Sequence, residues 1–152
     1  MKIAIGADHA GFERKKEIVA LLTELGHKVA DIGTHSEESV DYPDFASRVA
    51  RTVAKHQVDR GILICGTGIG MSIAANKVPG VRAAVCWNPK VAKLVSEHNQ
   101  ANVLCLSARF ISLPVTLKIV KAWLATPFAG GRHQRRIRKI SQLEALACSK
   151  RK

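Results

Sequence analysis

Two periods of apolar residues alternate along the chain, and each change of period marks a new element. Five short apolar runs have the length and composition of buried strands; they cover residues 2–7, 28–32, 61–65, 82–86 and 102–106. Between them apolar residues recur every three or four positions, as in Ile18, Leu21, Leu22 and Leu25, which predicts helices. The first helix ends at Gly26, and others are expected after Gly70 and at 44–56, 89–97, 113–124 and 134–147.

Strands that alternate with helices predict a parallel sheet, because parallel neighbours need a crossover connection. Right-handed crossovers place helices on both faces of the sheet. We therefore expect an α/β fold: a three-layer α/β/α sandwich, Rossmann-like, with a five-stranded parallel sheet. No linker rich in Pro, Gly or Ser interrupts the pattern, so residues 1–152 are expected to form one domain that ends in a helix and a basic tail at about 132–152.

Composition is that of an ordinary globular protein. The chain has 152 residues, of which 47% are hydrophobic, enough for one core. No apolar run approaches the roughly 20 residues that span a bilayer, and the strand-like KIAIGA follows Met1 directly, so a cytoplasmic protein is expected. The cysteines at 65, 86, 105 and 148 form no C-x-x-C pair. Buried reduced thiols are expected, with no metal site.

The balance of charge predicts an acidic partner. The formal net charge is +12, which suits nucleic acid, an anionic membrane surface or a phosphorylated small molecule. Eight of the 24 Lys and Arg residues lie in residues 132–152, against one acid, Glu144. Composition alone leaves these three classes of partner open.

Chemistry-bearing residues follow the ends of three predicted strands. Ligands of open parallel sheets bind outside the carboxyl ends of the strands. Asp8 and His9 follow the first strand, the run from Cys65 to Gly70 ends the third, and Arg109 follows the fifth. An acid, an imidazole, a thiol, a hydroxyl and a guanidinium therefore converge on one edge.

The glycine run CGTGIG at 65–70 fits neither common nucleotide motif. A Walker A loop would end in Lys-Ser or Lys-Thr, and a dinucleotide fingerprint would have its third glycine at Met71. Alternating glycines still let backbone N–H groups point into one concavity, which can hold an anion. Such a concavity would stabilise Cys65 as a thiolate, able to act as base or nucleophile. The alternative is a buried strand-end thiol beside a tight turn.

Five separated motifs carry a resemblance to a known family. They are GADHAG at 6–11, DYPDFA at 41–46, ICGTGIGMSIAANK at 64–77, EHNQANVL at 97–104 and GGRHQRR at 130–136. Together they resemble the type B ribose-5-phosphate isomerases, whose family also includes allose- and galactose-6-phosphate isomerases. The match runs in order from the first strand to about Ile140, and residues 141–152 carry no motif that can be placed.

The resemblance implies an aldose–ketose isomerase of carbohydrate metabolism. It would interconvert ribose 5-phosphate and ribulose 5-phosphate, in the pentose phosphate pathway, through an enediol and without metal or organic cofactor. Cys65 would be the base that moves a proton between C1 and C2, with Thr67 assisting. The enediolate would be stabilised by backbone amides of the loop, at Gly66, Gly68, Ile69 and Gly70.

His98 and Asn99 match the family's positions for opening the sugar ring and holding the substrate. His98 precedes its strand, so in a parallel sheet it lies at the opposite edge from Cys65. We therefore expect a second subunit to supply it, with a homodimer, or a tetramer built from dimers, sharing the active site. A solvated surface histidine is the alternative.

The resemblance assigns the phosphate to positively charged and hydrogen-bonding groups, since arginine suits bidentate capture. These groups are His9, Arg109, Arg132 and Arg136. Arg132 and Arg136 are four residues apart and share a helical face if the last helix has begun by then. Asp8 and Tyr42 would contact sugar hydroxyls or the ring oxygen.

Two alternatives stay open. The same site could act on allose 6-phosphate or galactose 6-phosphate, because pocket depth decides between pentose and hexose. A basic nucleic-acid-binding protein is the alternative of another class. Against it, aromatic residues make up only 5% of the chain, and no nucleic-acid module is recognisable. The expected partners are thus a sugar phosphate and a second copy of the chain, with no membrane.

Overall fold

A five-stranded parallel sheet forms the centre of the computed structural model of the protein, which describes residues 1–149 apart from the Cys148 side chain. Its strands are β1 (Lys2–Ala7), β2 (Lys28–Asp31), β3 (Arg60–Cys65), β4 (Ala83–Val85) and β5 (Val103–Ser107). Every neighbouring pair is parallel, in the order β2-β1-β3-β5-β4. The carboxyl ends of β1, β3 and β5 therefore lie side by side at one edge.

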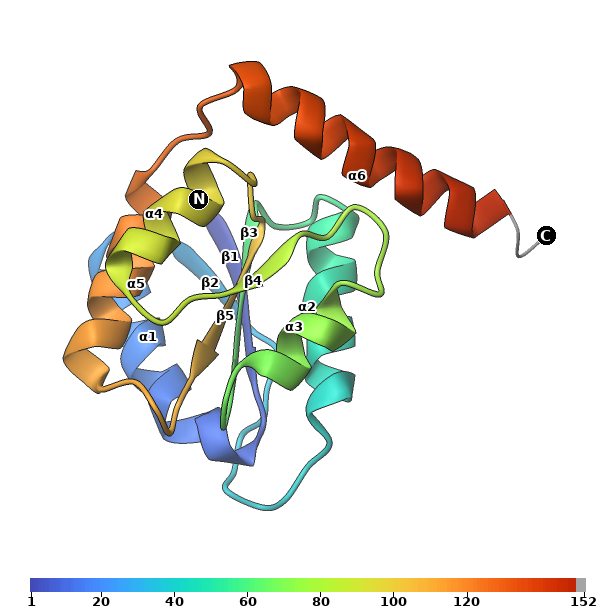
Figure 1. Cartoon of the computed structure of the whole chain (residues 1–152). Helices are drawn as coiled ribbons and strands as arrows, with labels where there is room; N and C mark the ends of the chain where they lie inside the picture. The colour runs from blue at the N-terminus through green and yellow to red at the C-terminus, as the bar shows by residue number, and fades with distance from the viewer. Residues whose placement is uncertain (150–152) are drawn as a thin grey trace.

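Helices cover both faces of this sheet, as Figure 1 shows. One face carries α1 (Phe12–Glu24), α4 (Pro89–Glu97) and α5 (Leu113–Ala125), and the other carries α2 (Tyr42–Ala54) and α3 (Ile69–Ala75). Successive strand residues point to opposite faces. In β3, Ile62 and Ile64 pack with Trp123 in one core, and Leu63 packs with Val49 in the other.

The last helix, α6 (Gly131–Ser149), runs across the outside of the sandwich (Figure 1). Its first turns are anchored by the buried side chains of His133 and Ile137. Further along, the Gly80 N–H donates to the Glu144 carboxylate at 3.1 Å. The large apolar side chains in the second half of the helix are exposed; they are Ile140, Leu143 and Leu146.

The predicted fold class is confirmed, and the differences concern boundaries. The helix predicted at 44–56 spans residues 42–54, because Pro43 occupies its first turn, where proline is favourable. The helix predicted at 134–147 spans 131–149, since the glycines before it hid its start. That the chain forms one domain stays a prediction, and residues 150–152 of the predicted basic tail lie outside the described part.

A buried ion pair ties α1 to the end of β2. The Lys15 ammonium donates to both carboxylate oxygens of Asp31 at 2.7 and 2.6 Å. The Lys15 side chain is only 1% exposed, whereas that of Asp31 is 36% exposed. Asp31 also accepts from the Gly33 N–H at 3.0 Å, and Gly33 in turn accepts from the Ala7 N–H. The ion pair thus fixes the segment that lies beside the end of β1.

We expect the two halves of this pair to differ in their contribution to stability. Asp31→Ala leaves a buried ammonium without a counter-charge and should lower the free energy of unfolding by about 3–5 kcal/mol. Lys15→Met leaves a carboxylate that water still reaches, so the loss should be smaller. Urea denaturation of both variants measures which loss in the free energy of unfolding is larger. Glu13→Ala, which breaks the exposed pair with Lys16, is the control and should cost less than about 1 kcal/mol. Equal losses at Asp31 and Lys15 would contradict this account.

Candidate active site

Three strand ends are joined by backbone hydrogen bonds into one platform. The Asp8 N–H donates to the Ile64 carbonyl at 3.2 Å, which links the end of β1 to β3. The Ala108 N–H donates to the Cys65 carbonyl at 2.9 Å, which links β5 to β3. The candidate residues that follow these strands, Arg109 included, are therefore held on adjacent backbones.

Cys65 lies under the glycine loop rather than on its surface. Its side chain is 5% exposed, and its sulfur accepts a hydrogen bond from the Gly68 N–H at 3.1 Å. An N–H donor at this distance stabilises negative charge on the sulfur. Gly68 has φ +80, and a Cβ there would lie 3.0 Å from the backbone of Leu106. Glycine is therefore needed to bring this N–H to the thiol.

Thr67 and Ile69 form the outer side of the loop. Both side chains are exposed, and the Thr67 hydroxyl accepts from the Ile69 N–H at 3.2 Å. Two of the amides assigned to the enediolate, those of Gly68 and Ile69, thus donate to side chains of the same loop. They hold the thiol and the hydroxyl in place, a role that the sequence did not reveal.

Arg109 and Ser107 brace the start of the loop at Gly66. The Gly66 carbonyl accepts from the Ser107 hydroxyl at 2.7 Å and from the Arg109 N–H at 3.2 Å. A Cβ on Gly66 would lie 3.4 Å from the Arg109 Nε, so the guanidinium packs against the loop. The predicted phosphate ligand Arg109 therefore lies beside the predicted base.

Asp8, His9 and Tyr42 complete this edge. The buried Asp8 carboxylate accepts from the Gly11 N–H at 3.1 Å and so caps the short 3-10 turn η1 (His9–Gly11). The His9 Nδ1 accepts from the Val40 N–H at 3.3 Å. Tyr42, at the start of α2, lays its ring on Gly70, where a Cβ would come within 2.6 Å of the ring.

A cavity of about 670 Å³ opens beside the loop and is lined by Thr67, Ile69 and Ser107. Trp87 and Phe110, both exposed, also line it. These two aromatic residues were not predicted from the sequence, because neither belongs to a motif. The available signal was a tryptophan placed directly after the strand predicted at 82–86, where a ligand of a parallel sheet would bind.

The remaining described cysteines have a structural role. Burial raises the pKa of Cys86 to about 12. Burial, and secondarily the neighbouring sulfurs, raises the pKa of Cys105 well above its ordinary value. Both stay protonated near neutral pH, as expected of buried thiols. Cys148 was expected to be another, and its side chain lies outside the described part.

A second cluster lies at the opposite edge of the sheet, where the strands begin. His98 caps the end of α4, and its ring stacks on that of His133 with centroids 4.1 Å apart and planes within 5°. The Arg132 Nε lies 3.5 Å from the His133 Nε2. Because α6 begins at Gly131, Arg132 and Arg136 lie one turn apart on the same helical face. Asn99 follows His98 and is exposed.

The predicted site residues thus form two groups. Cys65, Thr67, Asp8, His9, Tyr42 and Arg109 gather with the glycine loop at the carboxyl edge. His98, Asn99, Arg132 and Arg136 gather at the amino edge. One protomer does not bring the groups together, as the parallel topology predicted for His98. The stack on His133 could not be predicted from the sequence, although that residue lies within the GGRHQRR motif.

Comparison with known proteins identifies the family. The model of a family described as ribose/galactose isomerase matches residues 3–140. The chain belongs to this family. The resemblance seen in the five motifs is therefore confirmed.

Similar proteins of this isomerase family match over nearly the whole chain. Ribose-5-phosphate isomerase B of Escherichia coli K12 is 53% identical over 94% of this chain and 96% of its own length. The structure of Clostridium thermocellum ribose-5-phosphate isomerase B has a TM-score of 0.96 at 53% identity, covering 97% of this chain and 99% of its own. That of the Mycoplasma genitalium enzyme with bound ribulose-5-phosphate has a TM-score of 0.92 at 48% identity, covering 95% and 96%.

Two kinds of feature are absent from the part of the chain that the structure describes. Within residues 1–149 no helix is long and apolar enough to cross a membrane. In the same part of the chain, no three His, Cys, Asp or Glu side chains lie together in a group that could hold a metal ion.

Substitution of Gly68 should disturb both fold and site. Gly68→Ala places a methyl group against the Leu106 backbone and displaces the N–H that donates a hydrogen bond to the Cys65 sulfur. Gly80→Ala is the matched control, because Gly80 has φ +82 with no atom within 4 Å of an added Cβ. Gly68→Ala should lower the free energy of unfolding by about 1–3 kcal/mol more than Gly80→Ala. It should also lower isomerase activity, whereas Gly80→Ala should not. Denaturation and rate measurements that agree for the two variants would refute the role of Gly68.

His133 should make stability depend on pH. Burial, followed by the neighbouring His98, Arg132 and Arg136, lowers the pKa of His133, which Glu97 only partly opposes. The unfolded chain therefore binds a proton at this residue at higher pH than the folded one. The stability contributed by neutral His133 is present above about pH 6.5 and is lost as pH falls from there through the lowered pKa of the folded protein. From about pH 8 to about pH 5, wild-type stability should fall more steeply than that of His133→Phe. Urea denaturation at each pH measures this. An equal loss of stability in the two proteins over this range would contradict the assignment to His133.

Proposed function

We propose that the protein interconverts ribose 5-phosphate and ribulose 5-phosphate through an enediol intermediate. The observation that carries the proposal is the Cys65 sulfur, held at the carboxyl edge of the sheet by an N–H donor and adjoining a glycine loop and an arginine. Membership of the ribose/galactose isomerase family supports it. So does the bound ribulose-5-phosphate in the Mycoplasma genitalium relative. A cytoplasmic location stays a prediction.

The proposed reaction consists of proton transfers. With the sugar ring open, the Cys65 thiolate takes a proton from C2 of the aldose, and the electron pair shifts to make the C1–C2 enediolate. Return of the proton to C1, and loss of the hydroxyl proton at O2, gives the ketose. Thr67 shuttles the proton between the oxygens, and loop amides near Gly66 and Gly70 stabilise the developing charge. These steps involve no net oxidation, so the proposal includes no cofactor.

Ring opening and phosphate binding are assigned to both edges of the sheet. In the proposed site His98 donates a proton to the ring oxygen, and Asn99 holds the substrate beside it. Asp8 and Tyr42 bind sugar hydroxyls. The phosphate is shared by His9 and Arg109 at one edge and by Arg132 and Arg136 at the other.

Because the assigned residues lie at opposite edges of the sheet, the proposed site requires two protomers. Cys65 is the last residue of β3, whereas His98 follows α4 at the edge where the strands begin. We propose a homodimer in which the amino edge of one protomer covers the carboxyl edge of its partner. Each of the two sites then contains residues of both chains.

Mixed dimers test the proposed function and the shared site together. Cys65→Ala and His98→Ala should each be inactive as pure proteins with EDTA present. Subunit exchange at equal amounts should restore about a quarter of wild-type activity, because half of the dimers are mixed and each mixed dimer has one intact site. Mixing Cys65→Ala with Thr67→Ala is the control and should restore none, since both changes are at one edge.

The substrates of this assay discriminate among the alternatives. Ribose 5-phosphate is compared with allose 6-phosphate and galactose 6-phosphate. Turnover of a hexose phosphate alone would keep the mechanism and change the substrate. No recovery in the mixture of Cys65→Ala and His98→Ala, together with an active monomer, would overturn the shared site.

A further inference from the structure

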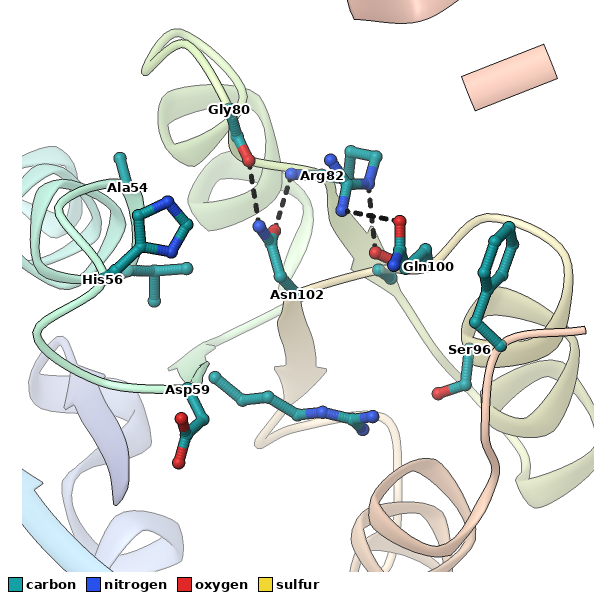
Figure 2. Close-up of a pocket in the computed structure, with 12 residues that line it drawn as sticks. Ala54, His56, Asp59, Gly80, Arg82, Ser96, Gln100 and Asn102 are labelled. Carbon is teal, nitrogen blue, oxygen red and sulfur yellow. Dashed lines mark hydrogen bonds between the residues drawn. The ribbon is translucent and has the colours of Figure 1, made fainter. Parts of the chain in front are cut away.

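A pocket of about 320 Å³ opens at the amino edge of the sheet and contains none of the residues assigned to the proposed substrate site. Arg60, at the start of β3, and Arg82, just before β4, line it together with His56, Gln100 and Asn102. Figure 2 shows His56 and Gln100 on the pocket wall, with Asn102 between them in that view. Polar side chains from three separate segments, at 56–60, 82 and 100–102, thus face one small space.

The two arginines of this pocket are partly buried without a carboxylate partner. Arg60 donates to the Trp123 carbonyl at 2.7 Å, and its guanidinium lies 4.7 Å from the Trp123 ring. Arg82 donates to the backbone and side-chain oxygens of Gln100 at 3.0 and 3.4 Å. Neither arginine belongs to an ion pair formed within residues 1–149. Asp59 acts electrostatically on Arg60, and Glu144 on Arg82, without forming ion pairs, so the burial of the two guanidiniums is only partly offset and a bound anion would offset it further.

Two residues that line this pocket have strained backbone conformations, which is further evidence that it has a function. His56 has φ 54 and Gln100 has φ 48, and in the described chain they are the only non-glycine residues with positive φ. Each follows a helix. His56 is spanned by a Schellman-type hydrogen bond from the Gln57 N–H to the Thr52 carbonyl, and Gln100 is spanned by a wider one from the Ala101 N–H to the Val95 carbonyl. Glycine is the favourable residue at such a position. In both places the side chain that glycine would lack lines the pocket.

The remaining polar groups restrict the ligand. The Asn102 amide is fixed, because it donates to the Gly80 carbonyl and accepts from the Arg82 N–H. Asp59 also lines the pocket, and its carboxylate accepts from the Lys2 N–H at 2.7 Å. The Asp59 carboxylate repels a second negative group on the ligand, and it can accept a hydrogen bond from a ligand hydroxyl. Outside the pocket, Glu144 acts electrostatically on Arg82.

We propose that this pocket binds a small phosphate ester that carries hydroxyl groups. Arg60 and Arg82 bind the phosphate, since guanidinium groups match its geometry. His56 and the Gln100 amide supply further hydrogen-bond donors, and the Asp59 carboxylate accepts a hydrogen bond from a ligand hydroxyl. The volume lies at the low end of the range for ligand pockets, which restricts the ligand to a small metabolite.

The two tryptophans report on the two edges separately. The Trp123 indole is buried against Arg60, and Trp87 lines the cavity beside Thr67. In ¹⁵N-labelled protein, titration with glycerol phosphate should shift the Trp123 indole signal saturably, with the signals assigned through Trp87→Phe. Inorganic phosphate is the second arm and should bind more weakly because it lacks the hydroxyls. Sodium chloride at equal ionic strength should not reproduce the shift.

Two variants and a control make the test decisive. Arg82→Gln should weaken binding at least about tenfold, since it removes a charge-assisted donor. Gln100→Gly should also weaken binding, yet raise the midpoint of thermal unfolding by about 2–4 °C, because it relieves the left-handed backbone. A loss of binding in this variant cannot come from unfolding. Arg51→Gln, on the exposed side of α2, is the charge-matched control and should bind like wild type.

Some outcomes would overturn the site. An unchanged Trp123 signal, or equal affinity in wild type and Arg82→Gln, refutes it. Isomerase activity measured on the same samples keeps the two proposals apart. An inactive protein whose Trp123 signal responds to glycerol phosphate would refute the proposed function alone. An active protein whose Trp123 signal does not respond would refute this pocket alone.

Discussion

Close approach of backbones at two glycines holds the candidate active site together. A Cβ on Gly11 would lie 2.8 Å from the Ile64 carbonyl oxygen, and one on Gly68 would lie 3.0 Å from the Leu106 backbone. Without side chains at these positions the turn after β1 packs on β3, and the loop after β3 packs on β5. The sheet order, with β3 between β1 and β5, makes both contacts possible. Placement of Asp8, Cys65 and Arg109 on one edge follows from this packing.

The fold could be predicted because its determinants are local and periodic. Apolar runs such as ILIC at 62–65 alternate with helical spacing, and parallel strands must end at the same edge. The position of Cys65 beside a glycine loop followed from these two facts alone. The identity of the reaction did not, because the residues permitted an inert thiol as readily as a base. It was the five motifs, and then the family match to residues 3–140, that settled the family.

What could not be predicted depends on contacts between distant segments. Lys15 occupies a charged stretch of α1 and is nevertheless buried, because Asp31 of β2 reaches it. The stack of His98 on His133 depends on the path of the chain between α5 and α6. Likewise, nothing in the composition indicates that His56 and Gln100 occupy positions that glycine normally fills. Each of these requires the tertiary structure, since the partners are separated by an element or more.

The amino-edge cluster is electrostatically incomplete in one protomer, and this links the fold to the proposed dimer. Arg132 and Arg136 share a helical face beside two stacked imidazoles, so positive charge accumulates there. A lowered pKa keeps His133 neutral and limits the repulsion, but it leaves both guanidiniums charged. A phosphate held by Arg109 of the partner protomer would neutralise them. In the proposed dimer the substrate therefore supplies the charge that the two protein surfaces lack, and binding it strengthens the contact between the edges.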